Sequence, residues 1–303
     1  MQINVKTALK TLWWVVVLCF IFFFLQGNIH RVEDVVRLLP LQVIAYSLLS
    51  LSIGKLLLVA IMHQSLLRYN VGFSFLQSFI IYNITQLGKY IPGSIWQFVG
   101  KIGMYKSAGL DNQTVRDTIV LETFWVVFSA FLFGLLLIGF TQYQILFALT
   151  QKVPPIIPLA LLGVVLVLLL LPRLKTQRQR LLAYSRRLSF TPLSFVTTLL
   201  VWLALGFAFW VTLIPFSATE IGLVYIIGLY AFSYAVGFAV PFAPAGIGIR
   251  ESVLVLGLAP FLDVNTSIIL AALNRVFYIL IEILLSAVSV TLSAHPSMNT
   301  PKS

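Results

Sequence analysis

Charged side chains are scarce in this sequence. They make up 10% of the 303 residues, whereas hydrophobic residues make up 60% and the mean hydropathy is +1.01. A soluble domain carries about 25% charged residues, because its surface must be wetted by water. The composition therefore excludes a soluble enzyme and predicts an all-α, polytopic integral membrane protein.

Residues that build metal and nucleophilic sites are equally rare. Cys19 is the only cysteine, so the chain can form neither an internal disulfide nor a cysteine-based metal site. The histidines His30, His63 and His295 are scattered over predicted loops and the tail. The sequence contains no HExxH, P-loop or GxSxG motif. We therefore expect neither a metal nor another cofactor.

Acidic residues are few, and the 20 Lys and Arg against 9 Asp and Glu give a net charge of +11. In a soluble protein this excess would suggest nucleic acid, but no basic, aromatic-rich soluble segment is present to bind it. In a membrane protein the same excess is typical of cytoplasmic loops and of contact with anionic lipid head groups. We expect membrane lipids, and not nucleic acid, as partners.

Six apolar segments are long enough to cross the membrane, since about 20 residues cover about 30 Å of hydrocarbon. They are Leu9–Leu25, Leu41–Met62, Asp117–Phe140, Ile156–Leu171, Pro192–Ile214 and Thr266–Ser293. No small-x-small cleavage site follows the first of them, so we interpret it as a retained span and not as a signal peptide.

Two further apolar segments are interrupted. Phe73–Leu87 resumes as Ser94–Tyr105, and Ile221–Val240 resumes as Ile249–Leu258. Each second part is too short to span, so each segment predicts a re-entrant or broken helical hairpin. The alternative is that both breaks are ordinary loops at the membrane surface. The predicted structural turns are Gly88, Pro92, Gly93, Pro241, Pro244, Gly246 and Gly248.

Orientation follows from the loop at residues 173–190, which is rich in Lys and Arg and has no acid. Such loops stay in the cytoplasm. The alternation of spans then places both termini in the cytoplasm, including the short polar tail at 294–303, and lets the two hairpins enter from opposite faces. We expect a single domain over residues 1–303 in the inner (plasma) membrane. In inverted repeats of this kind, broken helices build a substrate site near the midplane.

Ionisable residues inside apolar segments are costly and are therefore candidates for function. In the last segment, Asn274, Tyr278 and Glu282 recur every four residues and share one helix face. Ser286 and Ser289 extend this face, which we expect to look into the bundle or a water-filled cavity. The deeply placed ionisable residues are Lys55, Lys89, Glu122, Arg250, Glu251, Arg275 and Glu282.

These charges need partners. Arg250 and Glu251 are adjacent in sequence, so they cannot face each other along a helix. The simplest interpretation is that buried ion pairs only fix helix packing. The candidate pairs are Arg275 with Glu251, Arg250 with Glu282, and Glu122 with Lys101 or Arg116.

Polar and basic residues surround the first break, namely Gln86, Lys89, Tyr90, Trp96 and Gln97. Half-helix N-termini carry partial positive charge, which a nearby Lys or Arg reinforces, so the pattern suits an anion such as a phosphodiester head group. For Tyr90 and Trp96 the alternative is interfacial anchoring. The predicted substrate-binding residues are Gln86, Lys89, Tyr90, Trp96, Glu122, Arg250, Glu251, Arg275 and Glu282.

Both breaks also resemble a known family. The segment Asn83–Gly93 (NITQLGKYIPG) resembles part of the flippase-like transmembrane domain of lysylphosphatidylglycerol synthases. The segment Pro241–Glu251 (PFAPAGIGIRE) is similar to that family's second signature, in which a Pro/Gly-rich turn precedes a Glu. The resemblance covers nearly the whole chain. Residues that follow the first segment in the same pattern are Trp96, Lys101, Gly109 and Glu122.

The resemblance implies a lipid translocase. In two-domain members this domain moves aminoacylated phosphatidylglycerol between leaflets, and a separate cytosolic domain makes that lipid. The sequence ends at Ser303, shortly after the last span, so we expect no aminoacyl transfer. A lipid-linked sugar and another anionic lipid are equally compatible with the resemblance as substrates.

Two other classes of function remain open from the sequence. One is an intramembrane lipid transferase, for which no recognisable nucleophile or metal cluster is present. The other is a non-transporting scaffold that docks a lipid or glycan biosynthesis enzyme through the basic loop at 173–190. A homo-oligomer is compatible with either class.

Overall fold

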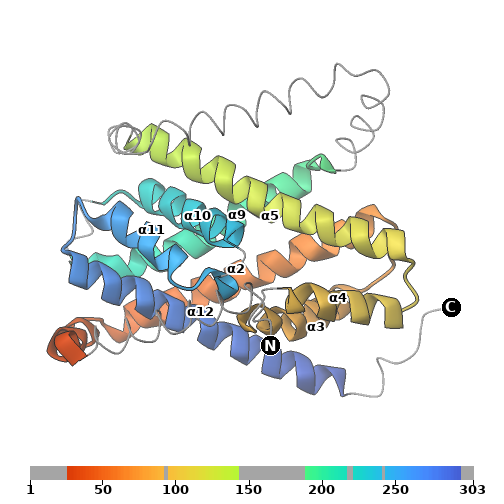
Figure 1. Cartoon of the computed structure of the whole chain (residues 1–303), viewed down its shortest axis with the longest axis horizontal. Coiled ribbons are helices and arrows are strands. Elements are labelled where there is room, and N and C mark those ends of the chain that lie inside the picture. The colour runs from red at the N-terminus through yellow and green to blue at the C-terminus, as the bar shows by residue number, and fades with distance from the viewer. Residues whose placement is uncertain (1–25, 92–94, 143–187, 217–220, 241–242, 295–303) are drawn as a thin grey trace, which may run out of the picture.

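The computed structural model describes residues 26–91, 95–142, 188–216, 221–240 and 243–294, and within these residues every regular element is a helix (Figure 1). Four of the helices are long and apolar enough to cross a membrane. This confirms an all-helical, multi-pass membrane protein. The four are α2 (Leu41–Arg68), α5 (Asn112–Thr141), α9 (Pro192–Leu213, continued by the 3-10 turn η3, Ile214–Phe216) and α12 (Val264–Ser293).

These helices coincide with four of the predicted spans, although their ends differ. Helix α5 begins before the predicted Asp117, because the Asp111 carboxylate caps it by accepting the Gln113 backbone N–H at 2.9 Å. The predicted spans Leu9–Leu25 and Ile156–Leu171 lie outside the described residues, as do nearly all of the basic loop and of the tail. The count of six spans therefore stays a prediction.

The two interrupted segments form pairs of short helices. In each pair the chain folds back at the break, so that the two helices pack against each other. We call residues 75–107 the first broken unit and residues 223–258 the second broken unit. The first contains α3 (Phe75–Gln86), η1 (Leu87–Tyr90) and α4 (Trp96–Ser107), and the second contains α10 (Leu223–Ala239), η4 (Pro244–Gly246) and α11 (Ile249–Leu258).

Glycine allows both breaks to turn tightly. At Gly88 a Cβ atom would lie 2.8 Å from the Gln97 backbone nitrogen, so any larger residue would separate η1 from α4. The second break passes through positive φ at Gly246 (+69°) and Gly248 (+83°), where residues with a side chain are strained. Gly88, Gly246 and Gly248 thus lie within the turns, and Pro244 begins η4. Pro92, Gly93 and Pro241 lie outside the described residues.

The two broken units approach α12 from opposite ends. Near the N-terminal half of α12, Arg275 forms an ion pair with Glu251 of α11 at 3.7 Å. Nearer its C-terminus, the Ser286 hydroxyl donates to the Asn83 carbonyl of α3 at 2.7 Å. About 16 Å of helix separates these contacts. The turns η1 and η4 touch each other between them, and Figure 1 shows α12 running past both units.

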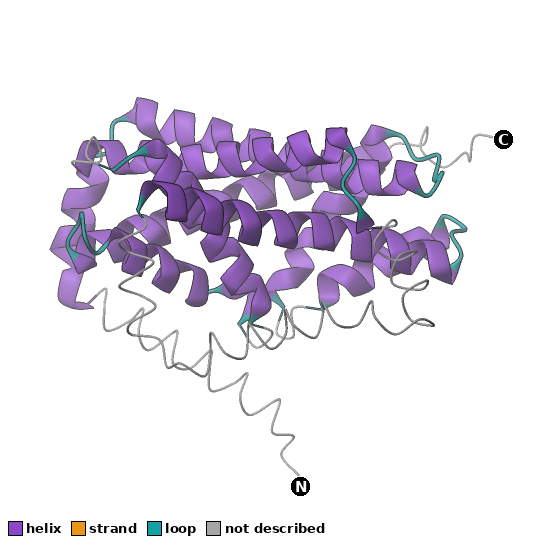
Figure 2. Cartoon of the chain, turned by 90° about the horizontal axis from the view of Figure 1, so that it is seen from above, coloured by secondary structure: helices purple, strands orange, loops and turns teal. Residues whose placement is uncertain are grey.

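Close packing of the long helices supports this arrangement (Figure 2). At Gly54 of α2 a Cβ atom would lie 2.4 Å from Leu205 of α9, and at Gly206 of α9 it would lie 2.6 Å from the Ile227 Cα of α10. Small residues let apolar helices approach closely, which stabilises helix association in a lipid environment. The helices α2, α5 and α9 therefore form a scaffold, and α10 of the second broken unit packs against α5 and α9.

Candidate functional site

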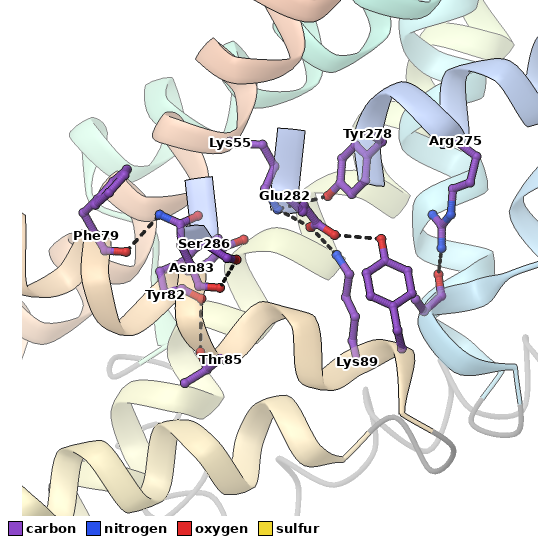
Figure 3. A network of polar contacts seen from close by, with 12 residues as sticks. Lys55, Phe79, Tyr82, Asn83, Thr85, Lys89, Arg275, Tyr278, Glu282 and Ser286 are labelled. Carbon is purple, nitrogen blue, oxygen red and sulfur yellow. Dashed lines mark hydrogen bonds and ion pairs between the residues drawn. The ribbon is translucent and has the colours of Figure 1, made fainter. Parts of the chain in front are cut away.

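Glu282 lies at the centre of a buried polar network (Figure 3). Its side chain is 1% exposed, and it accepts hydrogen bonds from Lys55 of α2, from Lys89 Nζ of η1 at 2.5 Å and from the Tyr90 hydroxyl at 2.7 Å. Lys55 is fully buried in the middle of α2. One carboxylate therefore serves two ammonium groups from different helices.

Tyr278 lies one turn before Glu282 and joins both broken units. Its ring centroid is 4.9 Å from Lys55 Nζ and 5.0 Å from Lys89 Nζ. It also lies 5.6 Å from the guanidinium carbon of Arg250 and 5.9 Å from that of Arg275. An aromatic face attracts cations through its quadrupole. Tyr278 therefore stabilises a group of cations that would otherwise repel one another.

Arg250 is held by aromatic rings. It lies in the first turn of α11, is 6% exposed, and faces the rings of Tyr230 at 5.2 Å and Tyr234 at 5.0 Å. Its aliphatic stem packs on Gly237 of α10, where a Cβ atom would lie 2.4 Å from Arg250 Cγ. Within the part of the chain that the structure describes, Arg250 Nε has no hydrogen-bond partner. A buried guanidinium thus keeps an unused donor.

A second buried ion pair links α4 to α5. Lys101 Nζ lies 2.6 Å from the Glu122 carboxylate, and both side chains are almost fully buried. Lys101 also lies 4.9 Å from the Tyr82 ring centroid. This confirms the predicted pairing of Glu122 with Lys101, whereas Arg116 pairs with its neighbour Asp117 at 2.9 Å.

The predicted pair of Arg275 with Glu251 is also confirmed, and Arg275 additionally donates to the Ala245 carbonyl of η4 at 2.7 Å. The alternative pair of Arg250 with Glu282 is wrong. Lys55 and Lys89 occupy the Glu282 carboxylate, and Arg250 points its guanidinium at tyrosine rings.

A cavity of about 260 Å³ lies between the two breaks. Three cations and one acid line it, namely Lys89, Lys101, Arg250 and Glu122. Most of the remaining wall is apolar, and polar side chains such as Gln86 and Tyr234 interrupt it. A pocket with an apolar wall and a few convergent charged groups is typical of a site for an amphipathic ligand.

The structure brings together most of the predicted binding residues, although not all of them face the cavity. Gln86, Lys89, Glu122 and Arg250 line it. Tyr90, Glu251, Arg275 and Glu282 are not part of the lining, but Glu282 binds the lining residue Lys89, and Arg275 donates to the carbonyl of the lining residue Ala245. Trp96 is 46% exposed at the start of α4 and is not part of the lining.

The sequence interpretation left several members of the cluster out of the predicted binding set. Tyr230 and Tyr234, four residues apart on α10, face Arg250, and Tyr82 contacts both Lys55 and Lys101. The spacing of Tyr230 and Tyr234 by four residues within an apolar segment is the available signal in the sequence. Among the described residues no group of three His, Cys, Asp or Glu side chains is close enough to hold a metal ion.

The family model described as lysylphosphatidylglycerol synthase TM region matches residues 9–286. The chain belongs to this family. The match includes both broken units of this lysylphosphatidylglycerol synthase TM-region protein and every residue of its central cluster. It indicates a lipid-related role in a membrane. No curated protein sequence matches the chain at a significant level.

Proposed function

We propose that this family member is a lipid translocase that accepts an anionic head group, of a phospholipid or a lipid-linked glycan, in the cavity between its two broken units. One observation carries the proposal. Lys89, Lys101 and Arg250 converge on the cavity where the two breaks meet, and only Glu122 opposes them in its wall. Buried charge of this kind is expensive in a membrane and marks substrate pathways.

The lengths of the short helices support a half-depth arrangement. At about 1.5 Å per residue, even the longest of them, α10, covers about 26 Å, which is less than the hydrocarbon thickness of about 30 Å. We therefore interpret both broken units as re-entrant hairpins that enter from opposite faces and place their turns near the midplane. Irregular backbone is tolerated there only beside protein or water. Residence in the inner (plasma) membrane, with both termini in the cytoplasm, completes this topology.

The direction of the helices also favours an anion. Helices α4 and α11 both begin immediately after a break, and residues from their first turns, Gln97 and Arg250, line the cavity. The N-terminal end of a helix carries partial positive charge and exposed N–H groups. Two such ends therefore reinforce the three cationic side chains of the wall.

Lys89 couples ligand binding to helix movement. It lines the cavity and also binds Glu282 of α12. An anion in the cavity competes with Glu282 for this ammonium group, while Lys55 keeps the carboxylate paired. A ligand shifts a conformational equilibrium by its differential affinity for the two states. Rocking of the broken units against the scaffold would then open the cavity to either leaflet.

The test is translocation of fluorescent phosphatidylglycerol in liposomes that contain the purified protein. We expect the Lys89→Ala/Arg250→Ala protein to lose most of the wild-type rate. Lys106→Ala is the matched control, because Lys106 lies on α4 but is exposed. Equal rates for the wild type and the double variant would contradict the proposal, as would an equal loss in the control.

A further inference from the structure

The interior of the described bundle holds more positive than negative charge. Five cations gather around the two breaks, but only three acids lie among them, which leaves two positive charges without an acidic partner. The cations are Lys55, Lys89, Lys101, Arg250 and Arg275, and the acids are Glu122, Glu251 and Glu282.

The remaining acidic residues of the sequence lie elsewhere. Of the nine in the chain, Glu33 and Asp34 are exposed, and Asp111 and Asp263 cap helix ends. The others are Asp117, which pairs with the exposed Arg116, and Glu220.

Glu220 falls outside the described residues, but its neighbour Ile221 precedes α10, at the end opposite the break. The residues of the two breaks that fall outside the described ranges are proline, glycine, serine and phenylalanine, none of which is charged. Among the residues that the structure describes, no further acidic side chain is therefore available to neutralise the excess at the breaks.

The excess is located at the cavity. Two lysines, Lys55 and Lys89, share the single carboxylate of Glu282, and of the two only Lys89 lines the cavity. Arg250, the other cation without its own acid, also lines it. Tyrosine rings reduce the cost of a buried cation but do not neutralise it. In the ligand-free protein, two positive charges at the cavity therefore lack a negative counter-charge.

We infer that the cavity takes a head group that carries two negative charges on phosphate, as in a lipid phosphomonoester or a diphosphate diester. Arg250 is its main receptor, because a guanidinium can donate two parallel hydrogen bonds to phosphate oxygens. A phosphodiester with one charge would leave one cation uncompensated. This inference rests on the proposed lipid-handling function and specifies its substrate class.

The size of the cavity limits what enters it. At about 260 Å³ it is slightly below the range of about 300–1,000 Å³ that holds a drug-sized ligand. It therefore fits a compact phosphate head group and not a whole lipid. Exposed apolar side chains at its edge, Ile95 and Phe238, offer the acyl or prenyl chain a surface outside it.

The test compares two lipids with the same acyl chains, phosphatidic acid and phosphatidylmethanol, which differ by one methyl group and one charge. At pH 8 the phosphomonoester has lost its second proton, whose pKa is about 6. Binding to the purified full-length protein is measured as the rise in its thermal unfolding midpoint. We expect half-saturation at an about tenfold lower concentration of phosphatidic acid than of phosphatidylmethanol.

Arg250→Gln should abolish most of this preference, and Lys89→Gln should do the same if the first variant does not fold. Lys106→Gln should keep it, because Lys106 is exposed on α4. Equal binding of the two lipids by the wild type would overturn the inference, as would an unchanged preference in both cavity variants. If inorganic phosphate saturated the protein at the same concentration as phosphatidic acid, the site would bind free phosphate, and the inference that its ligand is a lipid would be overturned.

The two proposals fail separately. If cluster-dependent translocation of phosphatidylglycerol occurs while phosphatidic acid has no advantage in binding, the inference is wrong and the translocase function stands. If phosphatidic acid is preferred but no lipid crosses the bilayer, the function is wrong and the two-charge site stands.

Discussion

The two broken units meet at one cavity, but their turns are stabilised in different ways. The turn of the first unit is held by side chains, since Lys89 and Tyr90 both bind the Glu282 carboxylate. The turn of the second unit has positive φ at Ala245 and Gly246 and close packing of Gly246 on Gly237, in addition to the hydrogen bond from Arg275 to the Ala245 carbonyl. The first turn thus depends mainly on a shared carboxylate, whereas the second depends more on backbone shape.

This difference indicates which unit can change during a transport cycle. A hydrogen bond to a carboxylate can be exchanged for a bond to a ligand phosphate, so the first unit has an alternative partner. The second turn also relies on van der Waals contacts between Gly246 and Gly237, which a ligand phosphate does not replace. We expect the turn of the first unit to rearrange when the ligand binds, and the turn of the second unit to keep its own shape and carry Arg250 as a rigid part of that unit.

The largest effect should follow from Glu282→Gln, which removes the acid that holds the first turn. Lys55 and Lys89 would stay buried without a counter-charge, and breaking a buried pair in this way costs about 3–5 kcal/mol. We expect a clearly lower free energy of unfolding in detergent. Glu33→Gln is the control, because its pair with Arg37 is exposed and contributes about 0–1 kcal/mol.

A double variant tests whether the cause is charge. Adding Lys55→Met to Glu282→Gln removes one of the two stranded cations, and residues in one network show coupling of about 0.5–3 kcal/mol. The double variant should therefore be more stable than Glu282→Gln alone. If the second change only adds a further loss, the first turn is not held by charge.

The next effect should come from Tyr90→Phe, which removes one hydrogen bond to Glu282 and leaves the ring in place. A hydrogen bond to a charged group contributes about 1.5–3 kcal/mol. We expect a smaller loss of stability than in Glu282→Gln, together with faster hydrogen exchange in residues 75–107. Tyr46→Phe is the control, because that ring is 59% exposed. If hydrogen exchange became faster only in residues 223–258, the hydrogen bond of Tyr90 would stabilise the second unit and not the first.

Gly246→Ala tests the shape-based turn. With φ at +69° and a Cβ atom 3.0 Å from the Gly237 Cα, alanine should strain the second unit by about 1–3 kcal/mol. The loss should appear as faster hydrogen exchange in residues 223–258. Gly103→Ala is the control, since no atom lies near its Cβ position and helical alanine gains about 0.5–1 kcal/mol over glycine. An unchanged exchange rate in the second unit would show that its turn tolerates a side chain.

Much of this architecture is readable from the sequence, because membrane burial leaves simple signals. Apolar length predicted α2, α5, α9 and α12, and the Pro and Gly residues predicted both breaks. The spacing of four residues predicted the polar face of α12, whose members Asn274, Tyr278 and Glu282 are indeed buried.

The pairing of charges was harder to predict. Lys55 and Glu282 are separated by 227 positions, and a helix that is apolar on all sides does not reveal which face looks inward. The sequence therefore indicates that both residues are deeply placed but does not indicate that they pair. The contact of Arg250 with Gly237 was hidden for a related reason, because a glycine within an apolar helix gives no sign of what packs on it.

The smallest effect concerns α12, the helix that both units share. Asp263 caps it by accepting the Thr266 backbone N–H at 3.1 Å, and loss of such a cap in Asp263→Ala costs about 1 kcal/mol. Hydrogen bonds from the Thr266 side chain and backbone lower the pKa of Asp263 in the folded protein. Its contribution is therefore present above the unfolded-state pKa of about 3.9 and is lost as the pH falls through the lower, folded-state pKa.

Unfolding free energies at pH 7 and at pH 3 test this prediction. The difference between the wild type and Asp263→Ala should be largest at pH 7 and should shrink in acid. Because α12 contacts both broken units, hydrogen exchange should accelerate equally in residues 75–107 and 223–258. If hydrogen exchange became faster in only one unit, α12 would stabilise the two turns unequally. Packing on α12 would then be a third cause, beside charge and shape, of the difference between the two turns.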